Sequence, residues 1–486
     1  MNAEPPALRR DAGSTLAEQL SARFVERIRH RLLPPGARLP SVRECARRHA
    51  VSPSTVVVAY DRLLASGLVE ARSQRGFFVR DVQSGAVREA GGAAVAPLPL
   101  PITATTLIRG MFQPPGDRPM PALGSLPADW LDLSLLAGAL RKVSRGAALA
   151  DASLRYGDPA GEMRLRQALS HKLADIGVQA PAQQIVTTLG ATQALDVITR
   201  SLLHSGDSVL VDEPGWAVEY ARLAALGMRV LPVPRGADGP DLAVMQKLIV
   251  THRPRLYVTV SVLHNPTGAS LSLRCAHQVL QLAQRHGLQI IEDDTYAHLA
   301  PPHLPRLCAL DGLQRTIYVS GFSKILAPNW RVGYLAAPAA LVDRLVDTKL
   351  LSTLTTPALT ELALAHCLEN GLLRRHADRV MQRLDDARTR TVAAAKQQGF
   401  SFAAEPRGLF GWVDTGVDTD RLAAPMLDAG WLIAPGSLFH ALPRASTLMR
   451  VNFATSQDLG FWRRLREAAH HLDRVVRLAP VIGPVA

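Results

Sequence analysis

Residues 320–334 read SGFSKILAPNWRVGY, and they come directly after the apolar, β-branched run Thr316–Val319. The run is typical of a buried strand, and the loop behind it carries small residues, a lysine and an arginine. Only six of the 55 basic residues in the chain are lysines, so Lys324 in this loop is informative. A charged loop behind a buried strand predicts a ligand site at the carboxyl end of that strand.

Four runs upstream have the same character, and helical segments such as Leu271–Arg285 separate them. This alternation predicts an α/β fold with a mostly parallel sheet. In such a sheet the carboxyl ends of the strands meet at one edge, where ligands bind. The four upstream strands are predicted at Ile185–Thr188, Ser208–Val211, Leu256–Val260 and Gln289–Ile291.

A polar cluster follows each of these strands. Singly, each cluster has an ordinary explanation, such as a turn asparagine, surface acidic residues or a solvated lysine. Five clusters at successive strand ends are hard to explain by accident, so we expect one site. The first cluster also opens a helix, whose N-terminal N–H groups favour phosphate. The upstream clusters are Gly190-Ala191-Thr192-Gln193, Trp216 in DEPGW, Asn265 in HNPTG, and Asp293, Asp294 and Tyr296 in IIEDDTY.

One cofactor chemistry uses this set of groups. A lysine amine can form a Schiff base with an aldehyde, an aspartate can keep a pyridinium nitrogen protonated, and an arginine beside a helix N-terminus can bind phosphate. These are the needs of pyridoxal 5′-phosphate (PLP). The region from about residue 125 to the end resembles the fold-type I aminotransferases in the order of these motifs.

The resemblance implies a role for each residue. Lys324 forms the Schiff base, and Asp293 pairs with the ring nitrogen. Trp216 stacks on the ring where relatives often have Tyr or Phe, and Arg450 in MRVNF binds the carboxylate of a substrate or effector. The other implied cofactor-binding residues are Ala191, Thr192, Ser323 and Arg331 at the phosphate, Asn265 and Tyr296 at the ring hydroxyl, and Tyr156 of YGDPAG, reaching across from a second subunit.

Two positions stand apart from this set. Gly321 lies where many relatives have Ser or Thr, which removes one expected hydrogen bond to phosphate. Asp294 is expected behind the site or facing solvent.

The four cysteines are scattered without a CxxC pair, so we expect reduced thiols and no metal site.

The N-terminal region has a different composition. Residues 1–80 carry 14 arginines and seven acidic residues, a net charge of +7 out of +13 for the whole chain. This indicates a module that binds a polyanion, although a solvated charged face is the alternative. Capping residues Thr15, Ser41 and Ser52 predict three helix starts, and strand-like runs at 68–72 and 77–80 predict a hairpin joined by Ser73-Gln74-Arg75-Gly76.

The run LPSVRECARRHAVSPSTVVVAYDRLLASGLVEARSQRGFFV, residues 39–79, resembles the winged helix-turn-helix of GntR-family transcription regulators. Many relatives have an arginine where Pro53 stands, so we expect DNA recognition to depend more on Arg43 and the wing. Arg47 and Arg48 are expected to be solvated charges that face phosphate. The residues that the resemblance assigns to DNA contact are Arg43, Ser52, Ser54, Thr55, Arg75 and Gly76.

Residues 81–127 contain eight prolines and six glycines, which predicts a linker between two domains. A proline-rich ligand for a partner protein is the alternative. The expected domains are the DNA-binding head at 1–80 and the PLP-binding body at 128–486. Within the body, a large subdomain covers about 155–350 and a small one mainly 355–480.

Composition limits the location of the protein. Hydrophobic residues make up 47% of its 486 residues and charged residues 20%, which is typical of a globular protein. We find no apolar run long enough to span a bilayer and no secretory signal near the start. We therefore expect a cytoplasmic protein with no membrane partner.

A GntR-like head joined by a linker to an aminotransferase-like body resembles the MocR subfamily of regulators. That resemblance implies a homodimer that binds a double-stranded DNA operator and responds to PLP, with or without an amino acid or amine effector. A catalytically active aminotransferase with an autoregulatory head is the main alternative, because Arg450 serves either role. A dimerisation scaffold without cofactor is a third interpretation, against which the intact Lys324, Asp293 and Arg331 argue.

Overall fold

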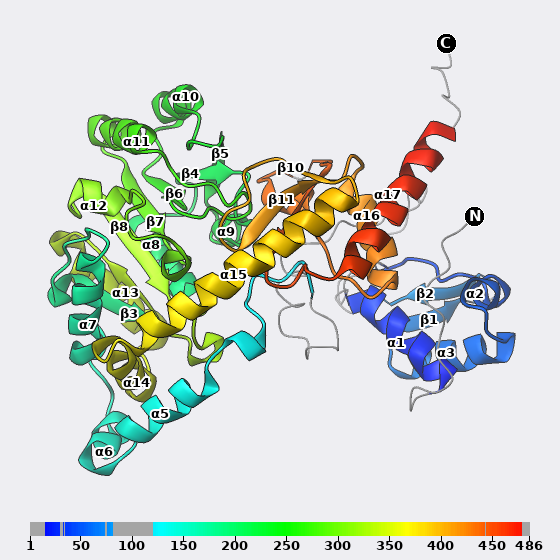
Figure 1. Ribbon diagram of the computed structural model, residues 1–486, viewed down its shortest axis with the longest axis horizontal. Coiled ribbons are helices and arrows are strands. Elements are labelled where there is room, and N and C mark those ends of the chain that lie inside the picture. The colour runs from blue at the N-terminus through cyan, green and yellow to red at the C-terminus, as the bar shows by residue number, and fades with distance from the viewer. Residues whose placement is uncertain are drawn as a thin grey trace.

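The computed structural model describes residues 15–29, 33, 35–72, 75–80, 120–442 and 444–478. They form a small N-terminal head, a large subdomain with a central sheet, and a small subdomain between them (Figure 1). Most of the predicted linker, residues 81–119, and Ser73 and Gln74 of the wing lie outside this description. Among the described helices, none has the length and apolar character needed to cross a membrane.

The head contains the three helices and the hairpin that the sequence predicts. Each helix begins at a predicted cap: the Glu18 amide donates to Thr15 Oγ1 at 3.2 Å, and Ser41 and Ser52 accept from the third residue beyond them. These contacts satisfy N–H groups that the first helical turn leaves unpaired. The elements are α1 (Leu16–Arg29), α2 (Val42–His49), α3 (Pro53–Ala65), β1 (Val69–Arg72) and β2 (Gly76–Val79).

A single aromatic cluster holds the head together. Tyr60 of α3 is fully buried, with its ring 5.4 Å from that of Phe24 on α1 and 5.0 Å from that of Phe77 on β2. The Tyr60 hydroxyl donates a hydrogen bond of 2.9 Å to the Pro40 carbonyl. Helix α3 is therefore fixed against both the first helix and the wing.

The large subdomain is built on a seven-stranded sheet in the order β3-β9-β8-β7-β6-β4-β5. Strand β9 is antiparallel to both of its neighbours, and the other neighbouring strands pair in parallel. This confirms the predicted α/β fold with a mostly parallel sheet. The strands are β3 (Ile185–Thr188), β4 (Ser208–Glu213), β5 (Arg229–Pro234), β6 (Leu256–Thr259), β7 (Gln289–Asp293), β8 (Thr316–Gly321) and β9 (Gly333–Ala336).

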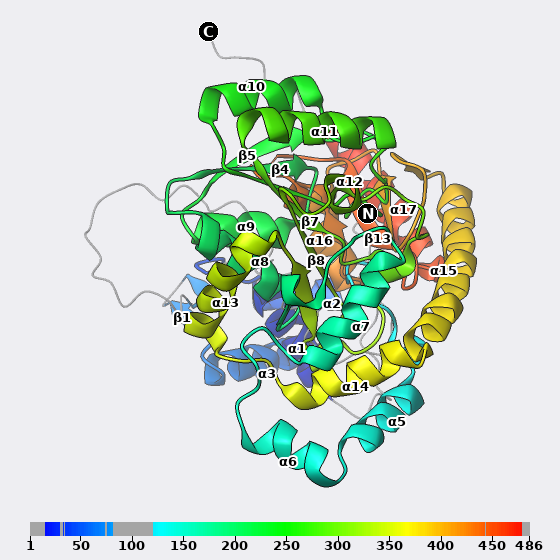
Figure 2. The ribbon, with the colours of Figure 1, turned by 90° about the vertical axis from the view of Figure 1, so that its left-hand side faces the viewer.

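Helices cover both faces of this sheet because its strands are apolar on both sides. Val209 and Val211 pack toward α8 (Ala191–Leu202), while Leu210 between them packs into the cluster that contains α10 and α11. Figure 2 shows α10 and α11 together at one side of the sheet. The covering helices are α8, α9 (Ala217–Ala225) and α13 (Ala339–Thr353) on one face, and α10 (Leu242–His252) and α11 (Leu273–His286) on the other.

The small subdomain contains a four-stranded antiparallel sheet in the order β10-β11-β13-β12. The 26-residue helix α15 runs from the large subdomain along this sheet (Figure 1). The elements of the small subdomain are β10 (Ser401–Phe402), β11 (Phe410–Asp414), β12 (Ala434–Pro435), β13 (Leu448–Asn452), α15 (Leu372–Gln397), α16 (Thr419–Asp428) and α17 (Leu459–Leu478). The other body helices are α5 (Leu133–Val143), α6 (Gly146–Leu154), α7 (Met163–Ala174), α12 (Leu307–Asp311) and α14 (Ala358–Glu369).

Residues 120–126, which we name the strap, lie against β13 although the sequence places them in the linker. The Asn452 side-chain amide donates to the carbonyls of Leu123 and Ser125 at 2.9 and 2.8 Å. The Thr455 hydroxyl donates to the Met120 carbonyl at 3.1 Å. The described part of the predicted linker is therefore bonded to the body.

The head contacts the small subdomain through α1 and α16. Arg27 of α1 lies 3.3 Å from the carboxylate of Asp428 at the end of α16, and less than a fifth of each side chain is exposed. An ion pair therefore links the head to the small subdomain.

Candidate functional site

The predicted cofactor residues converge at one edge of the large sheet. Asp293 ends β7, Asn265 follows β6, Trp216 follows β4, and Lys324 follows β8. The parallel register of these strands brings groups from distant parts of the chain together. The edge has three parts: an anion cradle, a small cavity and a buried arginine.

The anion cradle forms where α8 begins. Gly190 precedes the helix with φ +81°, and Arg331 donates to the Leu189 carbonyl at 2.9 Å and to Ser323 Oγ at 3.2 Å. A Cβ at Gly190 would lie 2.4 Å from the Arg331 guanidinium, so only glycine permits this approach. The first N–H groups of α8, at Ala191 and Thr192, have no partner within the helix. With Arg331, they present the kind of donors that a phosphate group requires.

Gly321 lies at the edge of this cradle. A Cβ built there would be 3.5 Å from the Ala191 amide nitrogen and 3.4 Å from Gly333 Cα, which is ordinary packing distance. A hydroxyl-bearing side chain at this position would therefore face the cradle. Glycine leaves the cradle without that donor.

A cavity of about 30 Å³ lies beside Trp216 and Asp293, and His264 also lines it. Asp293 is buried and accepts a 3.0 Å hydrogen bond from the Thr295 amide. Burial raises the pKa of Asp293 to about 6. A cationic ring nitrogen in this position would favour the charged carboxylate.

Lys324 brings an amine to this edge of the sheet, just after the end of β8. Burial, with a smaller contribution from the nearby cations Arg450 and Arg331, lowers the pKa of its amine to about 8, and Asp293 opposes that shift. A large share of the amine is therefore neutral near pH 8, as attack on a carbonyl carbon requires.

Arg450 of β13 is buried between two rings, at 4.4 Å from the centre of Phe410 and 5.2 Å from that of Phe439. It donates to Asn265 Oδ1 at 3.0 Å and to the Ala122 carbonyl of the strap. Within the described chain its Nε atom is buried without a partner. A buried guanidinium with a spare donor suits a carboxylate ligand.

The strap is a part of the site that the sequence did not reveal. A Cβ at Gly124 would lie 3.7 Å from Lys324 Nζ and 4.0 Å from the Arg450 guanidinium. The strap therefore passes beside both the amine and the buried arginine. The composition of residues 81–127 gave no sign of this, because the strap's partners in the body, such as Arg450 and Asn452, are distant in the sequence.

The other predicted residues divide into buried and exposed groups. Tyr296 is buried, with its ring 5.5 Å from that of Phe410, and it is hydrogen bonded to Asn265. Burial raises the pKa of its phenol above the ordinary value. Tyr156, in contrast, is 83% exposed, so it lies on the surface of its own chain rather than in the cradle.

Asp294 does not face solvent, which corrects one of the two positions expected for it. Its carboxylate is fully buried and accepts hydrogen bonds from Arg306 Nε at 2.7 Å and from the Tyr318 hydroxyl at 2.9 Å. Because successive residues of a strand point to opposite faces, the two neighbouring aspartates have different surroundings. Asp294 is part of a buried ion pair.

The predicted DNA-binding residues are exposed on the head, except for Thr55, which is half-buried. Arg43 and Arg75 are exposed, and Gly76 has φ +100° in the wing. The Ser52 hydroxyl is 2.8 Å from that of Ser54 and 2.7 Å from that of Thr55, so the start of α3 carries a cluster of hydroxyls. The other exposed residues of this region are Arg47, Arg48, Pro53, Val57 and Val58, and Arg38 lies beside Gly76.

Two family models match the chain. The family described as aminotransferase class I and II matches residues 131–460, and the bacterial regulatory proteins of the gntR family match residues 16–79. The probable rhizopine catabolism regulatory protein MocR of Rhizobium meliloti is 29% identical over 398 residues, covering 80% of this chain and 78% of that protein. The 2-aminoadipate transaminase of Thermus thermophilus is 28% identical over 337 residues, covering 68% and 84%.

Solved structures share the fold of the body. The crystal structure of LysN, an alpha-aminoadipate aminotransferase from Thermus thermophilus complexed with N-(5′-phosphopyridoxyl)-L-leucine, has a TM-score of 0.67 and 24% identity. The match covers 77% of this chain and 96% of LysN. This likeness concerns the arrangement of the elements alone.

Replacing Asp294 with Ala would leave the Arg306 guanidinium buried without its carboxylate. We expect a loss of roughly 3–5 kcal/mol in the free energy of unfolding, measured by urea denaturation with tryptophan fluorescence. The control combines Asp294→Leu with Arg306→Met, which removes both charges and should cost much less. Equal urea midpoints for the two variants would contradict the buried ion pair.

Proposed function

The chain belongs to the aminotransferase class I and II family and carries a gntR-family domain ahead of it, and from this pairing we propose a PLP-responsive transcription regulator. The head binds operator DNA, and ligand binding on the body changes that affinity. The proposal rests above all on one observation: an arginine-rich gntR-family head and an aminotransferase-family body with Lys324, Asp293 and Arg331 at one sheet edge occur in the same chain. The MocR protein of Rhizobium meliloti, which is similar along most of its length, supports it.

The groups at the sheet edge fit PLP. The cradle of Gly190 and Arg331 suits its phosphate, and Trp216 and Asp293 offer an aromatic face and a carboxylate for its ring. When bound, PLP supplies an aldehyde that an amine can capture and a ring that withdraws electrons. Lys324 Nζ is the capturing amine.

The protein residues then have separate tasks. Asp293 holds a proton on the ring nitrogen, Asn265 and Tyr296 orient the ring hydroxyl, and Trp216 covers one face of the ring. Arg331, Ser323 and the start of α8, with Ala191 and Thr192, hold the phosphate. Tyr156 is exposed on its own chain, which fits a role in the cradle of a second subunit. We therefore propose a homodimer.

An amino acid is the effector class that the site favours. Arg450 would bind its carboxylate in place of contacts that it now makes with Asn265 and the Ala122 carbonyl. Ala122 lies in the strap, which continues into the chain that leads to the head. Competition for Arg450 thus gives effector binding a direct effect on the segment that joins the two domains.

A working aminotransferase is the second candidate function. The lowered pKa of Lys324 favours it, because the same amine can take and return a proton on a bound amino acid. Turnover assays with a panel of amino acids and 2-oxo acids separate the two functions. Sustained conversion of an amino acid would add catalysis to regulation.

Capture of PLP by the apo-protein should depend on pH through Lys324. Because only the neutral amine attacks the aldehyde, we expect the capture rate to rise with pH and level off above about 8. Stopped-flow absorbance between about pH 6.5 and 10 measures this rate. Nα-acetyl-lysine, which keeps a free side-chain amine, is the control for the titration of PLP itself. A rate that still increases almost tenfold between about pH 8 and 9 would indicate an ordinary lysine.

Operator binding should respond to PLP only through Lys324. With an operator selected from genomic fragments, we expect PLP, alone or with an amino acid, to change the affinity of the wild type and to have little effect on Lys324→Ala. Lys247→Ala is the matched control, because Lys247 is an exposed lysine on α10. Identical titration curves for wild type and Lys324→Ala would make the body a passive dimerisation platform.

Arg43→Gln and Arg75→Gln should each weaken operator binding. The slope of log affinity against log salt should become shallower by about 0.9 for each phosphate that the variant no longer neutralises. Arg43→Gln should also reduce sequence discrimination by about 1–3 kcal/mol if this arginine contacts a base edge. The control, Arg274→Gln, lies on α11 at the end of the body opposite the head (Figure 1). Unchanged footprints for both head variants would contradict the assigned surface.

A further inference from the structure

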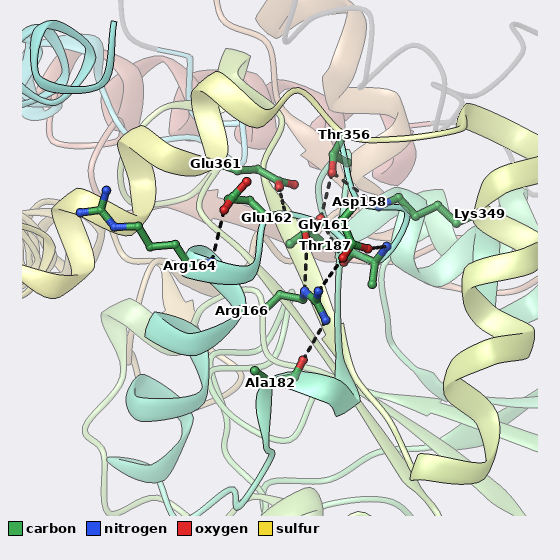
Figure 3. A network of polar contacts seen from close by, with 11 residues as sticks. Asp158, Gly161, Glu162, Arg164, Arg166, Ala182, Thr187, Lys349, Thr356 and Glu361 are labelled. Carbon is green, nitrogen blue, oxygen red and sulfur yellow. Dashed lines mark hydrogen bonds and ion pairs between the residues drawn. The ribbon is translucent and has the colours of Figure 1, made fainter. Parts of the chain in front are cut away.

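Residues 156–162, which we name the Tyr156 segment, are fixed on one side by Arg166 of α7. Arg166 is 4% exposed, and its guanidinium donates to the Gly161 carbonyl at 2.9 Å and to the Asp158 carboxylate at 3.0 Å (Figure 3). Asp158 in turn accepts from the Ala160 amide at 2.7 Å. The backbone that follows Tyr156 is thus held in one shape by a buried cation.

Strand β3 holds the same segment at very short range. The Thr187 amide donates to the Ala160 carbonyl at 2.9 Å. Gly161 has φ +104°, and a Cβ there would lie 1.8 Å from Thr187 Oγ1, so no larger residue fits without moving the strand. The segment cannot slide along β3.

Lys349 lies behind this contact and has no role in the site described above. It is fully buried on α13 and, among the described residues, its ammonium donates one hydrogen bond, of 3.5 Å, to Thr356 Oγ1. Thr356 Oγ1 lies 2.9 Å from Thr187 Oγ1, so the lysine reaches β3 through one hydroxyl (Figure 3). A buried ammonium with so few partners is costly, and apolar packing would serve stability better.

Nearby carboxylates explain how the charge is balanced. Glu361 is buried and accepts from the Glu162 amide at 2.7 Å, and its other oxygen has no partner in the described chain. Burial lowers the pKa of Lys349 to about 8, and the carboxylates of Glu361 and Asp158 oppose that shift. The negative charges that oppose this shift therefore lie at Asp158, within the Tyr156 segment, and at Glu361, which accepts from the Glu162 amide at the end of that segment.

Thr356 lies in the connection between α13 and α14, and Thr353, where this connection begins, supports the cradle of the same subunit. Gln193 of α8 donates to Thr353 Oγ1 at 2.7 Å and accepts from the Leu189 amide beside the cradle. Thr353 and Thr356 thus link the cradle and the Tyr156 segment. The connection joins the phosphate site of one subunit to the residue that this subunit offers to its partner.

We propose that Lys349 is a positioning residue that acts in trans: through Thr356, Glu361 and Thr187 it fixes the Tyr156 segment, and so the hydroxyl that completes the phosphate site of the partner subunit. This inference rests on the proposed function, since it requires a dimer that binds PLP. Lys349 itself touches no ligand.

Mixed dimers test the direction of the effect. In the first mixed dimer, one subunit carries both Lys324→Ala and Lys349→Met and the other is wild type. The only Lys324 amine then belongs to the wild-type subunit, and the altered subunit supplies Tyr156 to that site. In the second mixed dimer, one subunit carries Lys324→Ala and the other Lys349→Met. The only Lys324 amine then belongs to the Lys349→Met subunit, and the Lys324→Ala subunit, whose Lys349 is unchanged, supplies Tyr156 to that site. The reference is the dimer of Lys324→Ala with wild type. Two affinity tags isolate each dimer, and the visible absorbance of bound PLP reports only the working site.

We expect PLP affinity to fall about tenfold in the first dimer and to match the reference in the second, because one hydrogen bond to a charged phosphate is removed only in trans. Affinity for pyridoxal, which lacks the phosphate, should be the same in all three. Thr356→Val replaces Lys349→Met if the latter fails to fold, with the same expectation.

The other results have distinct meanings. Weaker PLP binding in the second dimer, equal PLP binding in all three, or parallel losses for PLP and pyridoxal would overturn the assignment of Lys349. A wild-type protein that binds no PLP would overturn the proposed function and this inference with it.

Discussion

The parallel alignment of β4, β6, β7 and β8 is the constraint on which the body depends. It brings Trp216, Asn265, Asp293 and Lys324, spread over more than 100 residues, to one edge of the sheet. The antiparallel strand β9 closes the arrangement at the cradle. A Cβ at Gly333 of β9 would lie 2.5 Å from the Gly190 carbonyl carbon, so two glycines must meet for the strand and the start of α8 to fit. The topology therefore determines which groups can react at this edge.

Most of this arrangement was predictable because each motif lies directly beside the strand that positions it. Strands with strong apolar runs, such as Thr316–Val319, indicate where an edge of the sheet lies, and Lys324 follows within a few residues. The head was equally predictable, since capping residues and hydrophobic spacing act over short distances. Local signals were sufficient wherever the decisive contacts were local.

The differences arise from contacts that are distant in sequence. Arg450 donates to Ala122, 328 positions away, and nothing in the composition of the strap indicates such a partner. Asp293 and Asp294 are chemically identical and adjacent, yet only the tertiary structure shows that Asp294 is paired with Arg306. The fully buried Lys349 is likewise missed by an interpretation that takes a lone lysine as solvated.

The strap also limits how this protein can be divided. A fragment that begins at residue 131, where the aminotransferase match begins, lacks the chain segment that contacts Arg450 and Asn452. Such a fragment exposes a face of β13 that is covered in the intact chain. Chimeras that exchange heads between related regulators therefore need their junction upstream of Met120. The unit that recombines intact is longer, at its N-terminal end, than the unit that family resemblance outlines.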